Sequence, residues 1–589
     1  MSVDKSVIKY SEYLLRTRRE EPTDAEIPSH RLLLRAGFIR QVAAGVFDFT
    51  PIAFRTMTKI IEIIRQEMNR IGGQELLMPV LNPASLWIET GRYDAVGPEL
   101  IRFRDRRGTE MCLAMTNEET VTDLARGYVS SWRDLPFMLY HIQTKIRDEA
   151  RPRGGVMRVR EFLMKDGYSF HRDFEDLAAY YEKIYDAYLR IFRRLGLSVV
   201  PVEADTGAMG GSASHEFLLP SGSGEDTFAR CAQCGMASNV ERAEVLTEPA
   251  ETGGTHPEAE PVHTPDMATI DDLTSSFGIG REQFLKAVAY SADGRIVIAF
   301  INGAYEINET KLKNRLGAVE LSVADPEALA RAGVVPGYIS PRVAKLPGVT
   351  VLFDRTVVSR PVYVMGGDKV DYHIKNAAIG RDIIVDEVVD IATVREGDAC
   401  PRCTKGKIGL ERGIELGHTF QLGAKYSESM GLTYLNEEGK EQLVVMGCYG
   451  IGVERAMASV IEAHHDEKGI LWPVTMAPFA VTVLPLGADH EVVAAAGRAA
   501  ESLSETCSVL MDDRPESAGV KFADADLLGM PIRAVVSKKL VAKGEVELKV
   551  RRTGEVVVVP EKNVPETVAR LLRTVAEKEG VMIDDTWPA

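Results

Sequence analysis

The chain has 589 residues, of which 45% are hydrophobic and 26% are charged, and its formal net charge at pH 7 is -16. This length predicts two to four domains, and the composition is globular, with no apolar run near the roughly 18 residues of a membrane span. The acidic balance disfavours non-specific nucleic-acid binding, so any contact with RNA must come from a local basic patch. Both charges are mixed along the N-terminal segment, without the apolar core of a secretory signal, so we expect a cytoplasmic protein and no membrane partner.

The first predicted elements are a long helix and a strand. Apolar residues recur at helical spacing from Ile52 to Ile71, and the pattern stops at Gly72-Gly73. A strand is expected next, from Glu75 to Val80. It contains Pro79, which has no amide hydrogen for a ladder, so we expect it at a sheet edge or ending near another surface.

The segment from Thr144 to Tyr168 is predicted to form two strands joined by a loop at Gly154-Gly155. Five arginines stand around that loop: Arg147, Arg151, Arg153, Arg158 and Arg160. A guanidinium holds phosphate with paired hydrogen bonds, and its flat face can lie on adenine. Glu149 could accept from the adenine amino group, and Phe162 could stack on the base. The hairpin therefore indicates an ATP site, and a charged surface hairpin is the alternative.

A second segment that could contact a ligand, Gly447 to Arg455, follows much later in the chain; the arginine hairpin and this segment are called the two strips below. Gly447, Gly450 and Gly452 stand where a strand is predicted to pass into a helix, and we expect them to let the backbone approach a ligand. Arg455 follows one turn into the helix. A dinucleotide-binding loop is the alternative, but the third glycine of that fingerprint is missing. Together the two strips predict ATP-dependent activation of a carboxylate.

Shifts in composition predict several domains. Residues after Cys234 are rich in Pro, Thr, Glu and Gly, as in a linker, and alternating helix and strand patterns then run to about Glu387. After Pro473 the strands 479–485 and 532–536 alternate with helices near 492–503 and 564–578. We expect these segments: 1–235, first part of a catalytic domain; 236–264, linker; 265–387, inserted domain; 388–473, second part of the catalytic domain; 474–589, C-terminal domain.

Two Cys-x-x-Cys pairs, Cys231/Cys234 and Cys400/Cys403, bracket the expected insertion. They are too far apart in sequence for a compact zinc ribbon. If the two ends of the insertion are adjacent, all four thiolates could meet on one tetrahedral Zn²⁺, and unligated cysteines are the alternative.

Five strings carry a resemblance to a known family: LLRAGFIRQVAAGVFDFTP, TKIRDEARPR, VREFLMKDGYSF, GGSASHEF and GIELGHTFQLGAKYS. The segments Ile52–Pro79, Arg147–Asp166 and Gly450–Arg455 are similar to motifs 1, 2 and 3 of class II aminoacyl-tRNA synthetases. Nearly the whole chain resembles the bacterial-type prolyl-tRNA synthetases. The resemblance implies an α/β multidomain protein, in which a class II antiparallel-sheet catalytic domain is interrupted by an α/β editing domain and followed by an α/β anticodon-binding domain.

The resemblance also implies the reaction and the partners. These are ligation of proline to tRNA(Pro) with ATP and Mg²⁺, and a homodimer with motif 1 at its interface. A class II synthetase for threonine or serine is one alternative. A synthetase-like binding protein that has kept the fold without the chemistry is another.

Roles are carried over position by position. Thr116 and Glu118 match the loop that holds the proline imino nitrogen, although Asn117 between them differs from the residue expected there. Arg147 is expected at the α-phosphate and the prolyl carboxylate. Residues expected at the nucleotide are Arg147, Glu149, Arg158, Phe162 and Arg455, with Arg147, Glu149 and Arg455 as the catalytic set. Three more residues are expected to line the proline pocket: His215, His418 and Cys448. For the two histidines, a structural role is the alternative.

The other domains receive roles in the same way. A pocket for proline cannot strongly exclude alanine, because each missing methylene is worth only about 1–3 kcal/mol, and the insertion is expected to hydrolyse alanyl-tRNA. The editing residues implied are Lys286, Gly337, Pro341, Asp354 and His373. A basic run from Lys538 to Arg552 is either a solvated strand face or a tRNA contact. The resemblance favours the second and implies tRNA-binding roles for Lys549, Arg551 and Arg552.

Overall fold

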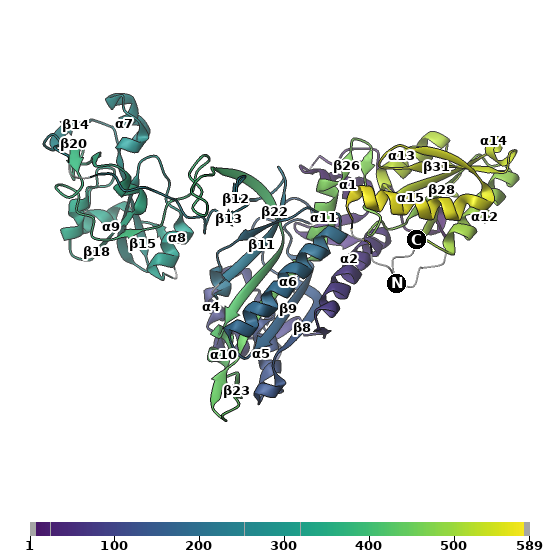
Figure 1. The fold of residues 1–589 in the computed structure, drawn as a ribbon, viewed down its shortest axis with the longest axis horizontal. Helices are drawn as coiled ribbons and strands as arrows, with labels where there is room; N and C mark the ends of the chain where they lie inside the picture. The colour runs from purple at the N-terminus through teal and green to yellow at the C-terminus, as the bar shows by residue number, and fades with distance from the viewer. Residues whose placement is uncertain are drawn as a thin grey trace. The chain divides into compact units, whose positions relative to one another are not determined.

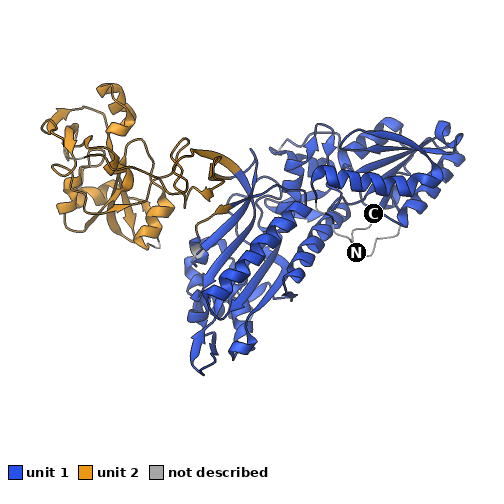
Figure 2. Ribbon diagram, in the orientation of Figure 1, with its two compact units in different colours: residues 1–201, 206–225, 413–589 blue, residues 202–205, 226–412 orange. Residues whose placement is uncertain are grey.

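The computed structural model describes residues 7–23, 25–211, 213–251, 254–318, 320–581 and 583. The chain forms two compact units (Figure 2): unit 1 comprises residues 1–201, 206–225 and 413–589, and unit 2 comprises residues 202–205 and 226–412. Residues 1–6 and 584–589 of the expected terminal domains, residues 252 and 253 of the linker, and Ser212 of the GGSASHEF string lie outside the described residues.

Unit 2 is wider at both ends than the expected 265–387. The flanking segments fold with it because Cys231, Met236, Ala392 and Cys400 share a buried apolar cluster with Ile301. The segment expected to be a linker therefore belongs to a compact unit.

An antiparallel sheet forms the centre of unit 1. Its strands are, in spatial order, β11 (Ala213–Pro220), the part of β22 (Ile408–Gly423) from Gly413 on, β25 (Val445–Gly452), β9 (Glu161–His171), β8 (Phe137–Ile146) and β4 (Gly73–Glu75). Among these six strands, as far as the structure describes them, β4 and β8 are the pair that runs parallel. Helices α2 (Pro51–Arg70) and α6 (Phe174–Arg194) pack against each other beside this sheet (Figure 1).

The predicted helix from Ile52 to Ile71 is confirmed as α2, whose apolar stripe includes the buried Ile60 and Ile64. The predicted strand from Glu75 to Val80 is wrong beyond Glu75. There the backbone turns away from the ladder: the Met78 amide donates to His141 Nδ1 at 3.4 Å, and Pro79 has no amide hydrogen to donate.

The two predicted structures around the site are confirmed. β8 and β9 form the hairpin, and its connecting loop contains Gly154 and Gly155, both at positive φ. At Gly155 a Cβ would lie 2.7 Å from the His30 ring, so only glycine fits. β25 passes directly into α11 (Val453–Ala463), as predicted for the second glycine strip.

The C-terminal domain is also α/β. Its sheet has the order β1 (Val7–Lys9), β29 (Val509–Met511), β28 (Val481–Leu486), β30 (Ile532–Ser537), β31 (Glu545–Val550) and β32 (Val556–Pro560), and its helices include α12 (His490–Ser504), α13 (Ala518–Leu528) and α15 (Val564–Glu579). The predicted strands and helices after Pro473 are therefore present.

The strand β1 departs from the expected domain division. Residues 1–235 were all expected in the catalytic domain, but the N-terminal segment joins the C-terminal sheet. β1 pairs in parallel with β29. The backbone amide and the hydroxyl of Ser11 donate to Asp513 at 2.9 and 2.6 Å, and the Arg514 guanidinium lies 3.5 Å from the centre of the Tyr10 ring. These contacts join the N-terminal segment to the C-terminal domain.

Unit 2 is a separate α/β fold. A mixed sheet has the order β17 (Leu321–Val323), β15 (Leu285–Ala292), β16 (Arg295–Asn302), β18 (Val349–Asp354) and β21 (Val388–Val389), and a second has the order β14 (Glu260–His263), β20 (Tyr372–Ala378) and β19 (Val362–Gly366). Its helices include α7 (Ile270–Phe277), α8 (Glu309–Leu316) and α9 (Pro326–Arg331). Among the described residues of both units, no helix has the length and apolar character needed to cross a bilayer.

The glycines of β25 differ in what a side chain would meet. At Gly447 a Cβ would lie 2.1 Å from the Tyr449 hydroxyl and 2.9 Å from Ser169 Oγ, whereas at Gly450 the nearest atom would be Met164 Sδ at 3.7 Å. Gly447 therefore makes room for a buried tyrosine rather than for a ligand, contrary to expectation.

We predict that Gly447→Ala destabilises the protein by about 1–3 kcal/mol, because the added methyl overpacks this site. Gly450→Ala is the matched control on the same strand and should cost much less. Urea unfolding of both variants measures the difference. Equal unfolding midpoints for the two variants would contradict the steric assignment.

Candidate active site

Arg147 follows directly on β8, at the mouth of the hairpin loop. Its guanidinium lies 5.2 Å from the centre of the Phe162 ring on β9, and its Nη2 is 3.5 Å from the Met115 carbonyl oxygen. Its Nε is buried and has no hydrogen-bond partner among the described residues. Burial lowers the pKa of Arg147, and the nearby positive charge of Arg455 lowers it further. Two guanidinium groups close enough to affect each other's charge, one of them with an unused N–H, suit an anionic ligand such as phosphate.

Glu149 lies in the same loop and is held as an ionised acceptor. Arg158 Nε donates to its Oε2 at 2.6 Å, and the Arg151 amide donates to its Oε1 at 3.0 Å. Burial acts to raise the pKa of Glu149, but these hydrogen bonds prevail and lower it. Arg158 also reaches Glu225. The structure thus brings together Arg147, Glu149, Arg158 and Phe162, as the sequence predicted.

Arg455 joins this loop to the central sheet from the first turn of α11. Its Nε donates to the Met157 carbonyl at 3.0 Å, and its Nη1 donates to the backbone and side-chain oxygens of Glu415, both at 3.0 Å. Burial acts to raise the pKa of Glu415, but His418 and Arg455 hold that pKa well below its usual value.

Sequence reasoning assigned no role to Glu415. In β22 Gly417 pairs with Phe217 and Glu415 pairs with Leu218, so Leu416 is an extra residue. This bulge accompanies the approach of Glu415 Oε1 to His418 Nδ1, at 3.2 Å. Only the strand register reveals this pairing.

His418 and His215 lie on opposite faces of the sheet. His418 is hydrogen-bonded to Ser214 Oγ at 2.5 Å, on the face of Glu415, whereas His215 is hydrogen-bonded to the Tyr181 hydroxyl of α6 at 2.9 Å. Neighbouring strand residues point to opposite faces, so His215 belongs to the packing of α6. The expected place of His215 in the pocket is not supported.

Thr116, Glu118 and Cys448 meet as predicted. Glu118 is buried in the first turn of α5 (Glu118–Arg126) and accepts from Thr116 Oγ1 at 2.6 Å and from Cys448 Sγ at 3.0 Å. Arg92 Nη1 is a third donor, at 3.3 Å. Burial and the Glu118 carboxylate raise the pKa of Cys448 well above its usual value, so the thiol stays a neutral donor.

A buried ionic cluster lies behind this loop. Lys145 pairs with Asp166 at 2.9 Å, Asp166 accepts from the Tyr168 hydroxyl at 2.6 Å, and His141 Nε2 lies 2.8 Å from Asp166 Oδ1. Burial acts to raise the pKa of Asp166, but Lys145 and His141 outweigh it and lower the pKa to about 2.

Asn117 connects the loop to this cluster. The Asn117 backbone amide donates to the Tyr168 hydroxyl at 2.9 Å, and Asn117 Oδ1 accepts from Lys145 Nζ. Its Nδ2 donates to Thr120 Oγ1 at 3.0 Å. The residue that departed from the family pattern is therefore buried and hydrogen-bonded on every side.

The residues expected in the editing site have two kinds of surroundings in unit 2. His373 is hydrogen-bonded to Thr264 Oγ1 at 2.7 Å, and its ring centre lies 5.3 Å from that of Tyr338, in the turn from Gly337 to Pro341. Burial lowers the pKa of His373 to about 4. Sequence reasoning missed Thr264, for which no motif gave a signal.

The other two expected editing residues have different surroundings. Lys286 on β15 forms an ion pair with Glu306. Asp354 is buried and accepts from the amides of Thr356 at 2.8 Å, Ile391 at 2.8 Å and Ala392 at 2.9 Å. These bonds occupy the acceptor positions of its carboxylate, so Asp354 holds backbone segments together and is not free to contact a substrate.

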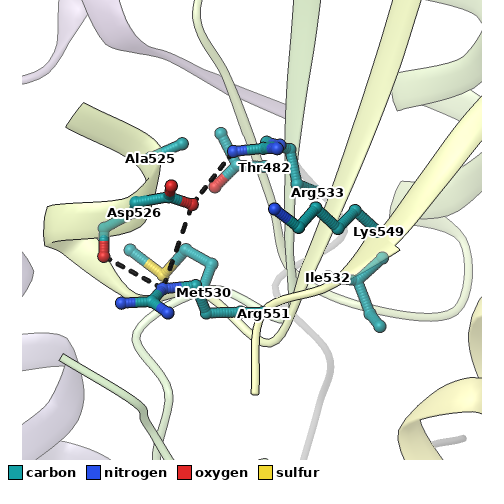
Figure 3. Close-up of a pocket in the computed structure, with 8 residues that line it drawn as sticks. All are labelled: Thr482, Ala525, Asp526, Met530, Ile532, Arg533, Lys549 and Arg551. Atoms are coloured by element: carbon teal, nitrogen blue, oxygen red, sulfur yellow. Dashed lines mark hydrogen bonds and ion pairs between the residues drawn. The ribbon is translucent and has the colours of Figure 1, made fainter. Parts of the chain in front are cut away.

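The three basic residues expected to bind tRNA in the C-terminal domain differ in their contacts. Arg551 forms two 2.7 Å bonds to Asp466, and Arg552 pairs with Glu579 at 2.7 Å. Both arginines are thus internal ties, which corrects their expected role at a tRNA surface. Lys549 and Arg551 both line a small pocket with Asp526, which accepts from Arg533 and lies near Arg551 (Figure 3).

The four cysteines of the two Cys-x-x-Cys pairs meet in unit 2. The Sγ distances are 3.8 Å for Cys231 and Cys403 and 3.6 Å for Cys234 and Cys400, and all four atoms lie within 4.8 Å of one another. A tetrahedral ion with Zn–S bonds of about 2.3 Å requires sulfur–sulfur distances of about 3.8 Å. The cluster therefore fits Zn²⁺.

Comparisons with known proteins identify the family of this chain. Residues 101–464 match the family described as tRNA synthetase class II core domain (G, H, P, S and T), and residues 480–571 match the family described as anticodon binding domain. Proline--tRNA ligase of Citrifermentans bemidjiense is 47% identical over 97% of this chain and 99% of its own length. That of Caldicellulosiruptor bescii is 46% identical over 96% and 99%.

Solved structures show the same fold. A prolyl-tRNA synthetase from Cryptosporidium parvum, complexed with halofuginone and AMPPNP, aligns with a TM-score of 0.58 at 13% identity and covers 95% of this chain and 80% of that one. The class II core and the anticodon-binding domain predicted from the motifs are thereby confirmed. The chain belongs to the proline--tRNA ligases, a family of class II aminoacyl-tRNA synthetases.

Proposed function

We propose that the chain activates proline with ATP and transfers it to tRNA(Pro). The observation that carries this proposal is the environment of Glu118. Among the described residues three donors reach its carboxylate, from Thr116, Cys448 and Arg92. A carboxylate offers about four acceptor positions, so one position is left for the cationic imino nitrogen of proline.

The nucleotide residues support the activation step. The prolyl carboxylate attacks the α-phosphorus of ATP, and pyrophosphate leaves. Arg147 neutralises the negative charge that develops at the phosphorus, while Phe162 and Arg455 hold the adenine and Glu149 accepts from its amino group. Catalysis here consists of positioning and charge stabilisation.

The family implies Mg²⁺ with ATP. The Glu415 and Glu216 carboxylates lie close together beside His418, and their oxygens fit the hard donors that Mg²⁺ prefers. When bound there, the ion would neutralise phosphate charge.

We predict that Arg147→Ala lowers proline-dependent exchange of pyrophosphate into ATP by about 100-fold or more, because it removes a donor to the developing charge. The exposed Arg133 is the matched control, and Arg133→Ala should leave exchange unchanged. The wild-type protein should show no comparable exchange with threonine or serine. Exchange that is absent with proline would overturn the proposed function.

Asn117 supplies a test of how the proline pocket is held. We predict that Asn117→Ala raises the KM for proline by about tenfold, because the buried Lys145 loses an acceptor and the loop with Glu118 relaxes. The KM for ATP should change little. Asn117→Asp keeps an acceptor for Lys145 and should recover part of the loss. An equal rise in both KM values would indicate general misfolding instead.

We further propose that unit 2 hydrolyses alanyl-tRNA. The turn from Gly337 to Pro341 and the neutral, buried His373 support this, and Thr264 joins them. Lys286 stays in the proposal as a cation at the edge of β15, and Asp354 is given a structural role.

We predict that Lys286→Ala slows release of alanine from alanyl-tRNA by about tenfold while proline activation is kept, because a positioned cation at the ester is lost. The exposed Lys313 on α8 provides the control Lys313→Ala. Deacylation with unchanged rate in Lys286→Ala would remove Lys286 from the editing site.

Three further proposals concern tRNA binding, a structural metal ion and assembly with a second copy of the chain. We propose that Lys549 contacts tRNA and that the four cysteines hold a structural Zn²⁺. We also propose a cytoplasmic homodimer. Leu77 and Leu81 come after β4, the edge strand of the unit 1 sheet, and are 75% and 49% exposed. Such exposed apolar surface is typical of a protein interface.

A further inference from the structure

The cysteine cluster is located at the two ends of unit 2. The chain enters this unit at Asp226 and leaves it after Arg412. Cys231 and Cys234 come shortly after the first point, and Cys400 and Cys403 come shortly before the second. The cluster therefore joins the two ends of one inserted segment.

The two cysteine loops have the same backbone design. In the first loop the Cys231 amide donates to the Met236 carbonyl, and the Cys231 carbonyl accepts from Gly235, both at 2.9 Å. In the second, the Cys400 amide donates to the Gly406 carbonyl, and the Cys400 carbonyl accepts from Thr404, again at 2.9 Å. Gly235 and Thr404 both have positive φ. Two loops far apart in sequence thus each present a pair of thiols from a turn with similar backbone hydrogen bonds.

Gly406 shows that the sulfur atoms are brought together by close packing. A Cβ at this position would lie 2.4 Å from Cys231 Sγ and 3.3 Å from Cys403 Sγ. The Gly406 amide also donates to Cys403 Sγ at 3.3 Å. Any larger residue would push the sulfurs apart, so the sequence keeps the space between the loops free of side chains.

Other contacts also join these two ends. The strand β12 (Asp226–Cys231), at the entry, is a hydrogen-bonded neighbour of β22, at the exit. The apolar cluster around the cysteines is small, and it reaches the sheet of unit 2 through Ile301. Lys311 of α8 ties the same two segments, because its Nζ donates to the Ala243 carbonyl at 2.5 Å and to the Ala392 carbonyl at 2.8 Å. A metal ion bound by four thiolates would contribute its binding free energy directly to the folding of this region.

We propose that Zn²⁺ on these four thiolates is a folding clasp for unit 2, so that loss of the metal abolishes editing while proline activation continues. The residues proposed for activation, among them Glu118, Arg147 and Arg455, all belong to unit 1. This inference rests on the zinc and editing functions proposed above. Thiolate ligands select Zn²⁺ over Mg²⁺, so the metal of the clasp is distinct from the ion used with ATP.

The test uses the full-length enzyme purified without chelator. Zinc content is measured by inductively coupled plasma mass spectrometry, with about one equivalent expected per chain. Zinc is then removed with 1,10-phenanthroline, the chelator is removed by gel filtration, and Mg²⁺ is restored. We expect hydrolysis of alanyl-tRNA to fall by at least about tenfold and proline-dependent pyrophosphate exchange to stay within about twofold. Limited proteolysis should show new cleavage sites within residues 226–412, and added Zn²⁺ should reverse both changes.

The variants and outcomes separate the proposals. Cys403→Ser should lose zinc and editing, whereas Cys507→Ala, at a cysteine of the C-terminal domain, should keep both. A protein without zinc that still hydrolyses alanyl-tRNA would overturn the zinc assignment. Zinc-loaded enzyme that does not hydrolyse alanyl-tRNA would overturn the editing function, and proteolysis would then decide the clasp. Unchanged editing and cleavage after zinc removal would overturn the clasp alone. If Cys403→Ser does not fold, the chelation arm decides.

Discussion

The buried ion pair between Lys145 and Asp166 is the interaction on which the site depends. Both groups are removed from water, so their charges must be paired and hydrogen-bonded. The partners that satisfy them are specific: His141 from the same strand as Lys145, Tyr168 from β9, and Asn117 from the loop of the proline pocket. The strands that carry the pair continue into the hairpin loop of Arg147. One cluster therefore positions the amino-acid pocket and the nucleotide platform together.

The rest of the site comes from a part of the chain that follows the insertion. β22 and β25 return to the central sheet beside β11 and β9, and α11 then directs Arg455 to the hairpin loop. The Arg455–Glu415 contact closes this arrangement, and the bulge at Leu416 belongs to it. The two ends of the inserted unit are joined by their own contacts, which include the neighbouring strands β12 and β22, the cysteines and Lys311.

Several side chains expected at ligands instead hold the fold. His215 packs on α6, and Asp354 accepts from backbone amides. Arg551 ties the C-terminal domain to Asp466, and Arg552 pairs with Glu579 inside that domain. A polar residue in a family motif can thus contribute to function by fixing the shape of a site. The C-terminal sheet shows a related effect, since β1 from the N-terminal segment completes it.

The family resemblance, rather than a residue pattern, placed Thr116 and Glu118 in one pocket. The sequence by itself determined the elements with a strong period or strict chemistry: the helix α2, the hairpin with its arginines, and the strand-to-helix passage before Arg455. These depend on local periodicity and on residue types whose spacing is short. Only the tertiary structure decided which face His215 occupies, where the strand after Gly73 ends, why Gly447 must be glycine, and that Glu415 reaches Arg455. Each of these depends on strand register or on a side-chain contact made in the folded chain, and neither leaves a local signal in the sequence.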